Sequence, residues 1–281
     1  MDIPTRELSD GTTIPQLGFG VFQVPPEDTK KVVLQAFEVG YRHIDTAQMY
    51  QNERGVGEAI AESGLSRDEI YVTSKLNNGF HRPEAARRAM DESLERLGLD
   101  QVNLFLIHWP LPTRYDGDFV STWQTMVELQ KAGKTASAGV SNFQSAHLDR
   151  IVAETSVAPV VNQIEVHPYF ANEGARSATA RHGALVEAWS PLAQGSVLED
   201  PALVEIANAV KRTTAQVTLR WHVQRGDVIF PKSVTPQRME QNFAIFDFEL
   251  SDAHMSTVNG LDRGEDGRTG PNPDTMDVIP D

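Results

Sequence analysis

A short apolar run near residue 45 ends in an aspartate, and a tyrosine follows it closely. Residues 40–53 read GYRHIDTAQMYQNE, which places Asp45 and Tyr50 five residues apart. Two later runs, IYVTSK and VNLFLIH, end in Lys75 and His108. A lysine lowers the pKa of a nearby tyrosine, ordinarily about 10, and so eases release of its proton. We therefore predict one acid–base site, built from these four side chains and directed at a substrate oxygen.

Each of these residues also has an ordinary structural interpretation. A lysine at the end of a strand more often forms an ion pair at a rim, and a histidine after an apolar run is more often packed. Repetition favours a functional site, because three successive runs supply an acid, a base and an imidazole. We expect Asp45 to keep Lys75 charged and His108 to donate a hydrogen bond to the substrate or to tune the Tyr50 proton. The chain holds no hydride donor, so reduction here requires a cofactor.

The elements that must position these side chains alternate between short β-type runs and helical patterns. Residues 83–98, PEAARRAMDESLERLG, are typical of a helix that starts with proline and ends at glycine. Eight strand–helix repeats in 281 residues predict an α/β fold, the closed eight-stranded parallel β/α (TIM) barrel, whose chemistry lies where the strands end. The predicted strands are 17–20, 41–46, 70–75, 102–108, 135–141, 159–166, 185–190 and 228–233.

The two ends of the chain have their own patterns. Residues 5–18 predict a β-hairpin, turning at Asp10 and Gly11, that plugs the bottom of the barrel. Residues 261–281, rich in Gly, Pro and Asp, predict a tail that is either disordered or laid across a surface. Because no linker is evident, we expect a single domain over 1–281.

A doubly wound nucleotide-binding sheet is the rival fold. Its first strand should lead through the pattern G-x-G-x-x-G directly into a helix. The candidate, GFGVFQ at residues 18–23, has two glycines and is followed by VPPED rather than by a helix. We reject this fold.

A possible phosphate site follows the last predicted strand. The motif IFPKSVTPQRMEQN places Lys232 at the strand end, Thr235 and Pro236 at a helix start, and Arg238 in the first turn. Helix N-termini bind phosphate groups through free N–H groups and the helix dipole. Two basic side chains beside one favour a phosphomonoester such as the 2′-phosphate of NADP. The alternative is a basic helix start paired with surface acids.

Other residues at strand ends suit a planar ring that carries a carboxamide. Trp189 ends the run LVEAW and either stacks on such a ring or packs in a core. Ser141, Asn142 and Gln163 match the donors and acceptors of a carboxamide, although alone they would be strand-end caps.

Composition excludes several classes of partner and site. The formal net charge is −14 and the sequence pI about 5.0, which disfavours nucleic acid and anionic membranes. There is no cysteine, so disulfides, thiol catalysis and thiolate metal sites are excluded. The eight histidines are scattered, and we predict no metal site. The first residues lack a signal-peptide pattern, and no apolar stretch could span a bilayer, so we expect a cytoplasmic protein.

The sequence resembles the aldo-keto reductases over essentially its whole length. The motifs that carry the resemblance are GYRHIDTAQMYQNERGVGEAI, VTSKL, LFLIHWP, GVSNF, VNQIEVHPY, AWSPL and IFPKSVTPQRMEQNF, in matching order and spacing. It looks closest to the bacterial branch that includes 2,5-diketogluconate reductases. The resemblance implies NADPH-dependent reduction of aldehydes or ketones, such as small carbonyls, α-dicarbonyls or keto-sugars. Tyr50 would be the general acid, with Asp45, Lys75 and His108 completing the catalytic set.

The resemblance also implies the remaining contacts. The cofactor-binding residues would be Val21, Phe22, Asp45, Ser141, Asn142, Gln163, Trp189, Ser190, Pro191, Leu192, Gln194, Gly195, Lys232, Ser233, Val234, Arg238, Gln241 and Asn242. The substrate-binding residues would be Phe22, Tyr50, Asn77, His108 and Trp109. Two positions depart from the family pattern: most relatives place Tyr at Trp189, and many place Trp at Asn77. A polar wall at Asn77 would favour polar substrates.

Two other functions deserve tests. A non-catalytic barrel that senses NADP would lack turnover, and the complete set of four polar residues argues against it. A Schiff-base aldolase would use Lys75 as its nucleophile, but Asp45 would keep that amine protonated and poorly nucleophilic. We expect a monomer that acts on a small-molecule carbonyl substrate.

Overall fold

Eight parallel strands form the centre of the molecule. The computed structural model describes residues 3–280, so the ends of the predicted domain and tail, Met1, Asp2 and Asp281, lie outside the described residues. The strands are β3 (Phe19–Gly20), β4 (His43–Asp45), β5 (Tyr71–Leu76), β6 (Val102–Ile107), β7 (Thr135–Ser141), β8 (Val161–Glu165), β9 (Leu185–Trp189) and β10 (Val228–Ile229). They pair in chain order, and a parallel bridge between Leu17 and Ile229 joins the two ends. The predicted TIM barrel is confirmed.

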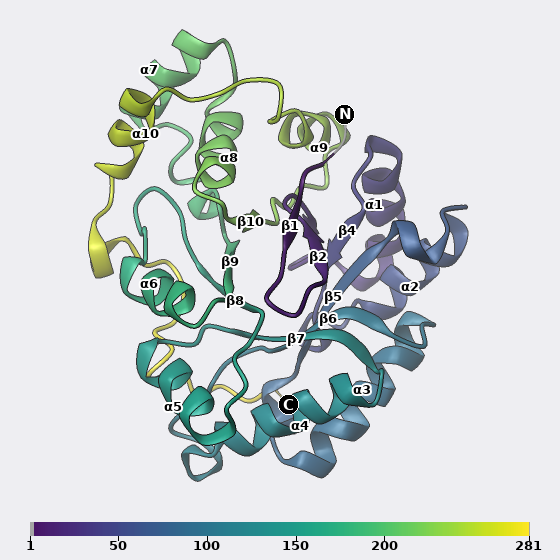
Figure 1. The fold of residues 1–281 in the computed structure, drawn as a ribbon. Helices are drawn as coiled ribbons and strands as arrows, with labels where there is room; N and C mark the ends of the chain where they lie inside the picture. The colour runs from purple at the N-terminus through teal and green to yellow at the C-terminus, as the bar shows by residue number, and fades with distance from the viewer. Residues whose placement is uncertain (1–2, 281) are drawn as a thin grey trace.

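Helices surround the strands on the outside (Figure 1). They are α1 (Pro26–Val39), α2 (Glu53–Glu62), α3 (Pro83–Leu97), α4 (Phe119–Lys131), α5 (Ser145–Thr155), α6 (Glu173–Arg181), α7 (Pro201–Val210), α8 (Thr214–Gln224), α9 (Pro236–Phe243) and α10 (Asp252–Asn259). Helix α3 begins at Pro83 and ends at Leu97, and the capping Gly98 adopts the left-handed backbone (φ 65°) that suits glycine. Helices cover the outer face of the barrel and side chains fill its interior. Both faces of the strands are therefore buried, which favours apolar residues along them.

The hairpin closes one end of the barrel. Strands β1 (Thr5–Glu7) and β2 (Thr13–Pro15) are antiparallel and lie across the centre of the strand ring (Figure 1). Ile14 is fully buried and packs in the interior cluster that contains Leu104 and Leu106. Ser137 of β7 donates to Asp10 Oδ2 at 2.7 Å, which fixes the hairpin turn against the barrel. The predicted plug is therefore present.

Strand lengths differ from the prediction at two places that matter for the site. Strand β10 stops at Ile229, two residues before Pro231, which has no N–H to continue a ladder. Lys232 therefore lies three residues beyond the strand rather than at its end. Gln163 was expected at a strand end and instead occupies the middle of β8.

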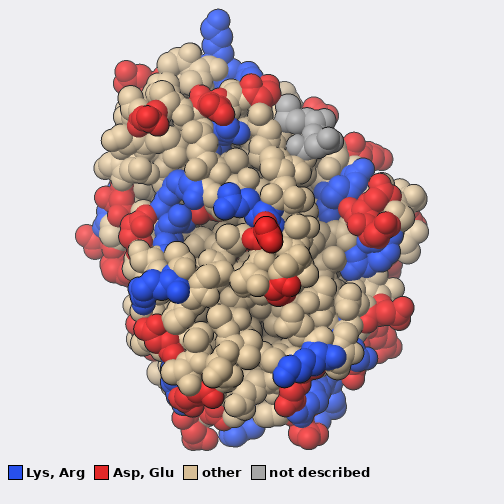
Figure 2. Space-filling model, in the orientation of Figure 1, with Lys and Arg blue, Asp and Glu red and all other residues tan. Residues whose placement is uncertain are grey.

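The surface carries mixed charge. Figure 2 shows Lys and Arg interspersed with Asp and Glu over the face that carries the hairpin, without one large basic area. Within residues 3–280, no helix is long and apolar enough to cross a membrane.

Candidate active site

A buried lysine joins the aspartate and the tyrosine of the opening stretch. Lys75, on β5, is 0% exposed, and its Nζ donates to Asp45 Oδ1 at 2.6 Å and to the carbonyl of Thr46 at 3.0 Å. The same Nζ lies 3.3 Å from the Tyr50 hydroxyl, to which it donates. Asp45 is the last residue of β4, and Tyr50 ends the short 3₁₀ helix η1 (Gln48–Tyr50). The structure thus brings three of the four predicted catalytic residues into direct contact.

The charges of this trio depend on burial as well as on contact. Burial alone lowers the pKa of Lys75, but the charges of Asp45 and Tyr50 and the hydrogen bonds to both together outweigh burial and raise the pKa above its ordinary value. Asp45 is the first of the groups that raise this pKa, and its role in keeping Lys75 charged during the reaction stays a prediction. Burial raises the pKa of Tyr50 more than Lys75 lowers it. The prediction that the Tyr50 pKa falls below its usual value is wrong for the protein alone, because desolvation of the phenolate dominates.

His108 lies beside this trio. It directly follows β6, is buried, and its ring centroid is 5.7 Å from that of Tyr50 in an edge-on arrangement. Burial, helped by the nearby positive charge of Lys75, lowers the pKa of His108 well below its usual value. The imidazole is therefore neutral at pH 7 and has one N–H to donate. It makes no hydrogen bond to the Tyr50 hydroxyl in the structure.

The predicted carboxamide-binding residues form a connected network at the next strands. Trp189 Nε1 donates to Asn142 Oδ1 at 2.8 Å, and Asn142 Nδ2 donates to Ser141 Oγ at 3.0 Å and to the carbonyl of His108 at 2.9 Å. Ser141 Oγ donates in turn to the carbonyl of Gln163 at 2.8 Å. The side chains of Asn142 and Trp189 are thus held by the protein itself. Gln163 Oε1 receives no hydrogen bond within residues 3–280, which leaves it able to accept one from a ligand.

The predicted phosphate site is a pair of exposed basic residues at a helix start. Helix α9 begins with Pro236 after the N-cap Thr235, as predicted. Lys232 and Arg238 are both exposed, and neither forms an ion pair with any described residue. Ser233 is buried and accepts the Thr235 N–H at 3.1 Å. Of the other predicted contacts here, Val234 is exposed, Gln241 is half-buried and Asn242 is buried.

The loop after β9 has an unusual backbone. Ser190, Gln194 and Gly195 have φ values of 49°, 55° and 96°, in the left-handed region. The Ala193 N–H donates to the Ser190 carbonyl at 2.8 Å and the Gly195 N–H to the Leu192 carbonyl at 2.7 Å, so the loop is folded into tight turns. Pro191, also in this loop, accepts a hydrogen bond from the buried His222 Nε2 at 3.2 Å, and Leu192 is half-buried. These residues were expected to bind the cofactor, and that expectation stays a prediction.

The first barrel loop brings two more predicted residues to the site. The Val21 N–H donates to the Asp45 carbonyl at 3.1 Å. Phe22 is 56% exposed, and its ring lies 5.0 Å from that of Tyr50. Sequence reasoning missed Asn52, whose Nδ2 donates to the Val21 carbonyl at 2.9 Å and whose Oδ1 accepts from Thr46. Asn52 lies two residues after Tyr50 in the same polar stretch, and this closeness could have identified it from the sequence.

Two of the predicted substrate-binding residues, Asn77 and Trp109, lie in loops that are joined by a hydrogen bond. Asn77 Oδ1 accepts the Gly79 N–H at 2.8 Å, so this side chain is turned back on its own loop. Trp109 is buried directly after His108. The loop after β6 contacts the loop after β5 through Tyr115, whose hydroxyl donates to the Asn78 carbonyl at 2.7 Å.

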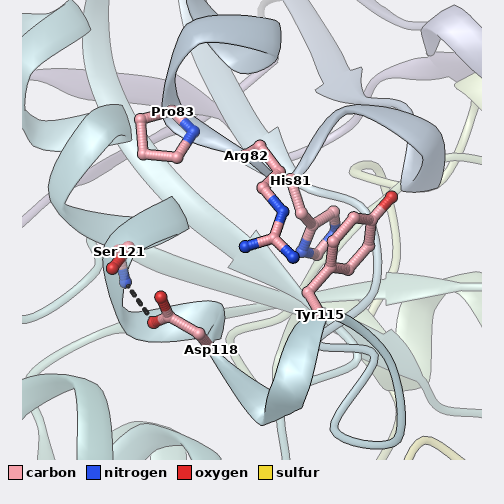
Figure 3. Close-up of a pocket in the computed structure, with 6 residues that line it drawn as sticks. All are labelled: His81, Arg82, Pro83, Tyr115, Asp118 and Ser121. Atoms are coloured by element: carbon pink, nitrogen blue, oxygen red, sulfur yellow. Dashed lines mark hydrogen bonds between the residues drawn. The ribbon is translucent and has the colours of Figure 1, made fainter.

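A small cavity lies between these two loops. Figure 3 shows the His81 ring flat against Tyr115, beside Arg82. The ring centroids are 5.1 Å apart and the ring planes differ by 5°. Nearby, Asp118 caps helix α4 by accepting the Ser121 N–H at 2.9 Å. The cavity is lined by structural contacts and contains none of the predicted catalytic residues.

The C-terminal tail is laid across the surface, one of the two predicted alternatives. The buried Glu165 carboxylate accepts the backbone N–H and the hydroxyl of Thr269, both at 2.6 Å, and the Gly270 N–H at 3.0 Å. Gly270 packs so closely on Trp189 that a Cβ there would lie 2.4 Å from the indole. Further on, Asn78 Nδ2 donates to the Val278 carbonyl at 2.9 Å. The sequence did not predict the role of Glu165 or the contacts that the tail makes.

The chemistry of the donor set fits NADP. The open acceptor at Gln163 suits a carboxamide, and the two exposed cations at α9 suit a phosphomonoester. Among the described residues, no group of three or more His, Asp or Glu side chains could hold a metal ion. A barrel with an acid–base trio and such a set of groups is a nicotinamide-dependent oxidoreductase.

Comparison with known proteins identifies the family. Residues 16–263 match the model of the Aldo/keto reductase family, and the chain belongs to this family. An aldo-keto reductase of Mycolicibacterium smegmatis is 45% identical over 273 residues, which cover 97% of this chain and 98% of that protein. The methylglyoxal reductase DkgA of Escherichia coli is 43% identical over 270 residues, which cover 95% and 96%. The predicted family and its bacterial branch are confirmed.

Solved structures of similar proteins support the same family assignment. The apo form of Gox0644 superposes with a TM-score of 0.94 at 42% identity and covers 98% of this chain and 99% of that one. A mutant of Gox0644 in complex with NADPH gives a TM-score of 0.93 with the same identity and coverage. The protein is therefore an NADP-dependent oxidoreductase that reduces carbonyl compounds.

Proposed function

We propose that this enzyme reduces small aldehydes and ketones, α-dicarbonyls in particular, with Tyr50 as the general acid. The observation that carries the proposal is the single ammonium group of Lys75 that bridges Asp45 and Tyr50. A buried ammonium group 3.3 Å from a phenol stabilises the phenolate that proton donation leaves behind. No other described tyrosine contacts a lysine in this way.

The chain's own residues account for the movement of the proton. NADPH, when bound, supplies a hydride to the carbonyl carbon. Tyr50 donates its proton to the carbonyl oxygen, so the C=O bond becomes a C–O–H group and Tyr50 becomes a phenolate. Lys75 offsets that negative charge, and Asp45 keeps Lys75 protonated. The neutral His108 donates its N–H to the same oxygen and so fixes the direction in which the carbonyl points.

The remaining residues hold the cofactor. Lys232 and Arg238 would bind the 2′-phosphate, with Ser233 and Val234 beside them and Gln241 and Asn242 near the adenine. The loop that includes Ser190, Pro191, Leu192, Gln194 and Gly195 would bind the pyrophosphate. Ser141, Asn142 and Gln163 would face the carboxamide, Trp189 would stack on the ring, and Val21 and Phe22 would border it. The free acceptor of Gln163 and the exposed side chains of Lys232 and Arg238, all unpaired among the described residues, support this assignment.

The substrate class rests on the relatives and on the polarity of the site. Proteins named methylglyoxal reductase DkgA, from Escherichia coli, Salmonella typhimurium and Yersinia pestis, are 43–44% identical to this chain. Methylglyoxal carries two adjacent carbonyl groups. Asn77 retains its Nδ2 donor after its oxygen is used by Gly79, so it can hold the second carbonyl. Phe22, Trp109 and His108 would form the rest of the wall.

A substrate panel tests the function. The wild-type protein should oxidise NADPH, followed at 340 nm, fastest with methylglyoxal and other α-dicarbonyls, more slowly with simple aldehydes and keto-sugars. NADH should support much lower rates at equal concentration. Binding of NADPH without turnover on any carbonyl would contradict the proposal and favour a sensor. Trapping of a borohydride-reduced adduct on Lys75 would favour an aldolase instead.

A further inference from the structure

One buried carboxyl group in the barrel has no place in the proton-transfer scheme. Glu187 lies in the middle of β9 and is 0% exposed. The register pairs it with Gln163 on the adjacent strand β8. Gln163 Nε2 donates to Glu187 Oε2 and to Asp45 Oδ2, both at 2.9 Å. A single amide nitrogen thus bridges Glu187 and the counter-ion of Lys75.

The surroundings of Glu187 disfavour a negative charge. Asp45 faces it from β4, Tyr71 and Lys75 from β5 and Gln163 from β8, while β10 offers only the apolar Val228 and Ile229. No described cation forms an ion pair with it. Burial, followed by the charge of Asp45, raises the pKa of Glu187 to about 8. The group is therefore mostly protonated at pH 7, and Asp45 keeps the only negative charge beside Lys75.

The bridge fixes the orientation of the Gln163 amide. An amide nitrogen has two hydrogens, and here both are directed at carboxyl oxygens. The reverse orientation would place Gln163 Oε1 against the ionised Asp45, which repels it. The oxygen therefore points away from both carboxyl groups, and no described residue donates to it.

We propose that Glu187 is a positioning residue for the cofactor: with Asp45 it holds the Gln163 amide so that Oε1 accepts the N–H of the nicotinamide carboxamide. This inference rests on the proposed contact between Gln163 and the nicotinamide. Glu187 itself touches neither cofactor nor substrate. Its protonated state lets it accept from Gln163 without adding a second negative charge next to Lys75.

Cofactor binding without substrate provides the first test. Glu187→Gln keeps an acceptor of the same shape, and Glu187→Leu removes it. We expect the dissociation constant of NADPH, measured by fluorescence at pH 7, to be within about twofold of wild type for Glu187→Gln and about three- to tenfold weaker for Glu187→Leu. Thr73→Val, which removes the buried hydrogen bond to His43 at 2.9 Å, is the matched control and should bind normally.

Two outcomes of that titration are informative in different ways. If wild type binds NADPH and Glu187→Leu binds equally well while remaining folded, the positioning role is overturned and the proposed function stands. If wild type itself does not bind NADPH, the proposed function fails first.

Stability against pH provides a second measurement that needs no cofactor. An unfolded glutamate titrates at about 4.3, so above that pH the unfolded chain loses a proton that folded Glu187 keeps. Wild-type stability is therefore lost as pH rises to about 8 and is constant beyond it. Since glutamine does not titrate, the Tm of Glu187→Gln relative to that of wild type should rise steadily from pH 5 to pH 8. A constant difference would show that Glu187 is ionised from pH 5 to pH 8 and would overturn its protonated state, while the NADPH titration decides its positioning role.

Discussion

Lys75 Nζ lies 2.6 Å from Asp45 Oδ1, and both side chains are buried. A buried ion pair of this kind contributes little net stability, because both groups lose their hydration. Its value lies in the charge that it maintains beside Tyr50. The pair therefore sets the acidity of the site, and its two members should respond differently to substitution.

Asp45→Asn should impair both stability and catalysis. Asparagine has nearly the same shape but leaves the buried Lys75 without a counter-ion, which costs about 3–5 kcal/mol in the free energy of unfolding. The Lys75 pKa should then fall, and kcat/KM for methylglyoxal at pH 7 should drop by about 100-fold. Denaturant unfolding and steady-state kinetics measure the two effects. Asp100→Asn, at an exposed position, is the control, and equal behaviour of the two variants would refute this role.

The reductive rate should be insensitive to pH over the neutral range. Burial raises the pKa of Tyr50 above its usual value of about 10, so the acid form persists up to that pH and is lost only above it. Burial lowers the pKa of His108 well below its usual value, so His108 stays neutral from pH 6 upward. With saturating NADPH, kcat should be flat between about pH 6 and 9 and fall at higher pH. A fall centred near pH 7 would mean that another group supplies the proton.

The two exposed cations at α9 should determine the choice of cofactor. Each charge-assisted hydrogen bond contributes about 1.5–3 kcal/mol, so Lys232→Ala or Arg238→Ala should raise KM for NADPH about 10- to 100-fold. KM for NADH, which lacks the 2′-phosphate, should change little. Lys31→Ala, at an exposed position on α1, controls for the loss of one positive charge. A parallel rise for both cofactors would place the phosphate elsewhere.

The contact between the tail and Trp189 should be equally testable. In Gly270→Ala the new methyl group would lie 2.4 Å from the indole, so either the tail or Trp189 must move. We expect NADPH to bind about 3- to 30-fold more weakly, since the ring that would stack on the nicotinamide is displaced. Gly174→Ala is the matched control, because a Cβ there meets nothing within 4 Å. Unchanged NADPH affinity with an intact fold would separate the tail from the cofactor site.

The parts that the sequence could predict are those with local signals. The eight strands follow from β-type runs, and α3 and α9 follow from proline at their first turn. The proximity of Asp45, Lys75 and His108 follows from barrel topology, because successive parallel strands end at the same face. Tyr50 was found only through its spacing from Asp45.

The parts that escaped prediction depend on contacts between distant segments. In the sequence, Glu187 is a single acidic residue within an apolar run. Only the pairing of β8 with β9 shows that it lies beside Gln163. Glu165 and Gly270 are 105 residues apart, and nothing local pairs them. The direction of the Tyr50 pKa was mistaken because a sequence supplies the charge partners but not the depth of burial, which here is the larger effect.

The general-acid role of Tyr50 is most directly tested by Tyr50→Phe, assayed for binding and turnover on the same preparation. Phenylalanine keeps the ring that packs against Phe22 and His108 and removes only the hydroxyl. We predict that NADPH binds within about twofold of wild type, while kcat for methylglyoxal falls by about 100- to 10,000-fold. A variant that binds NADPH and retains more than about a tenth of wild-type kcat would contradict the assignment.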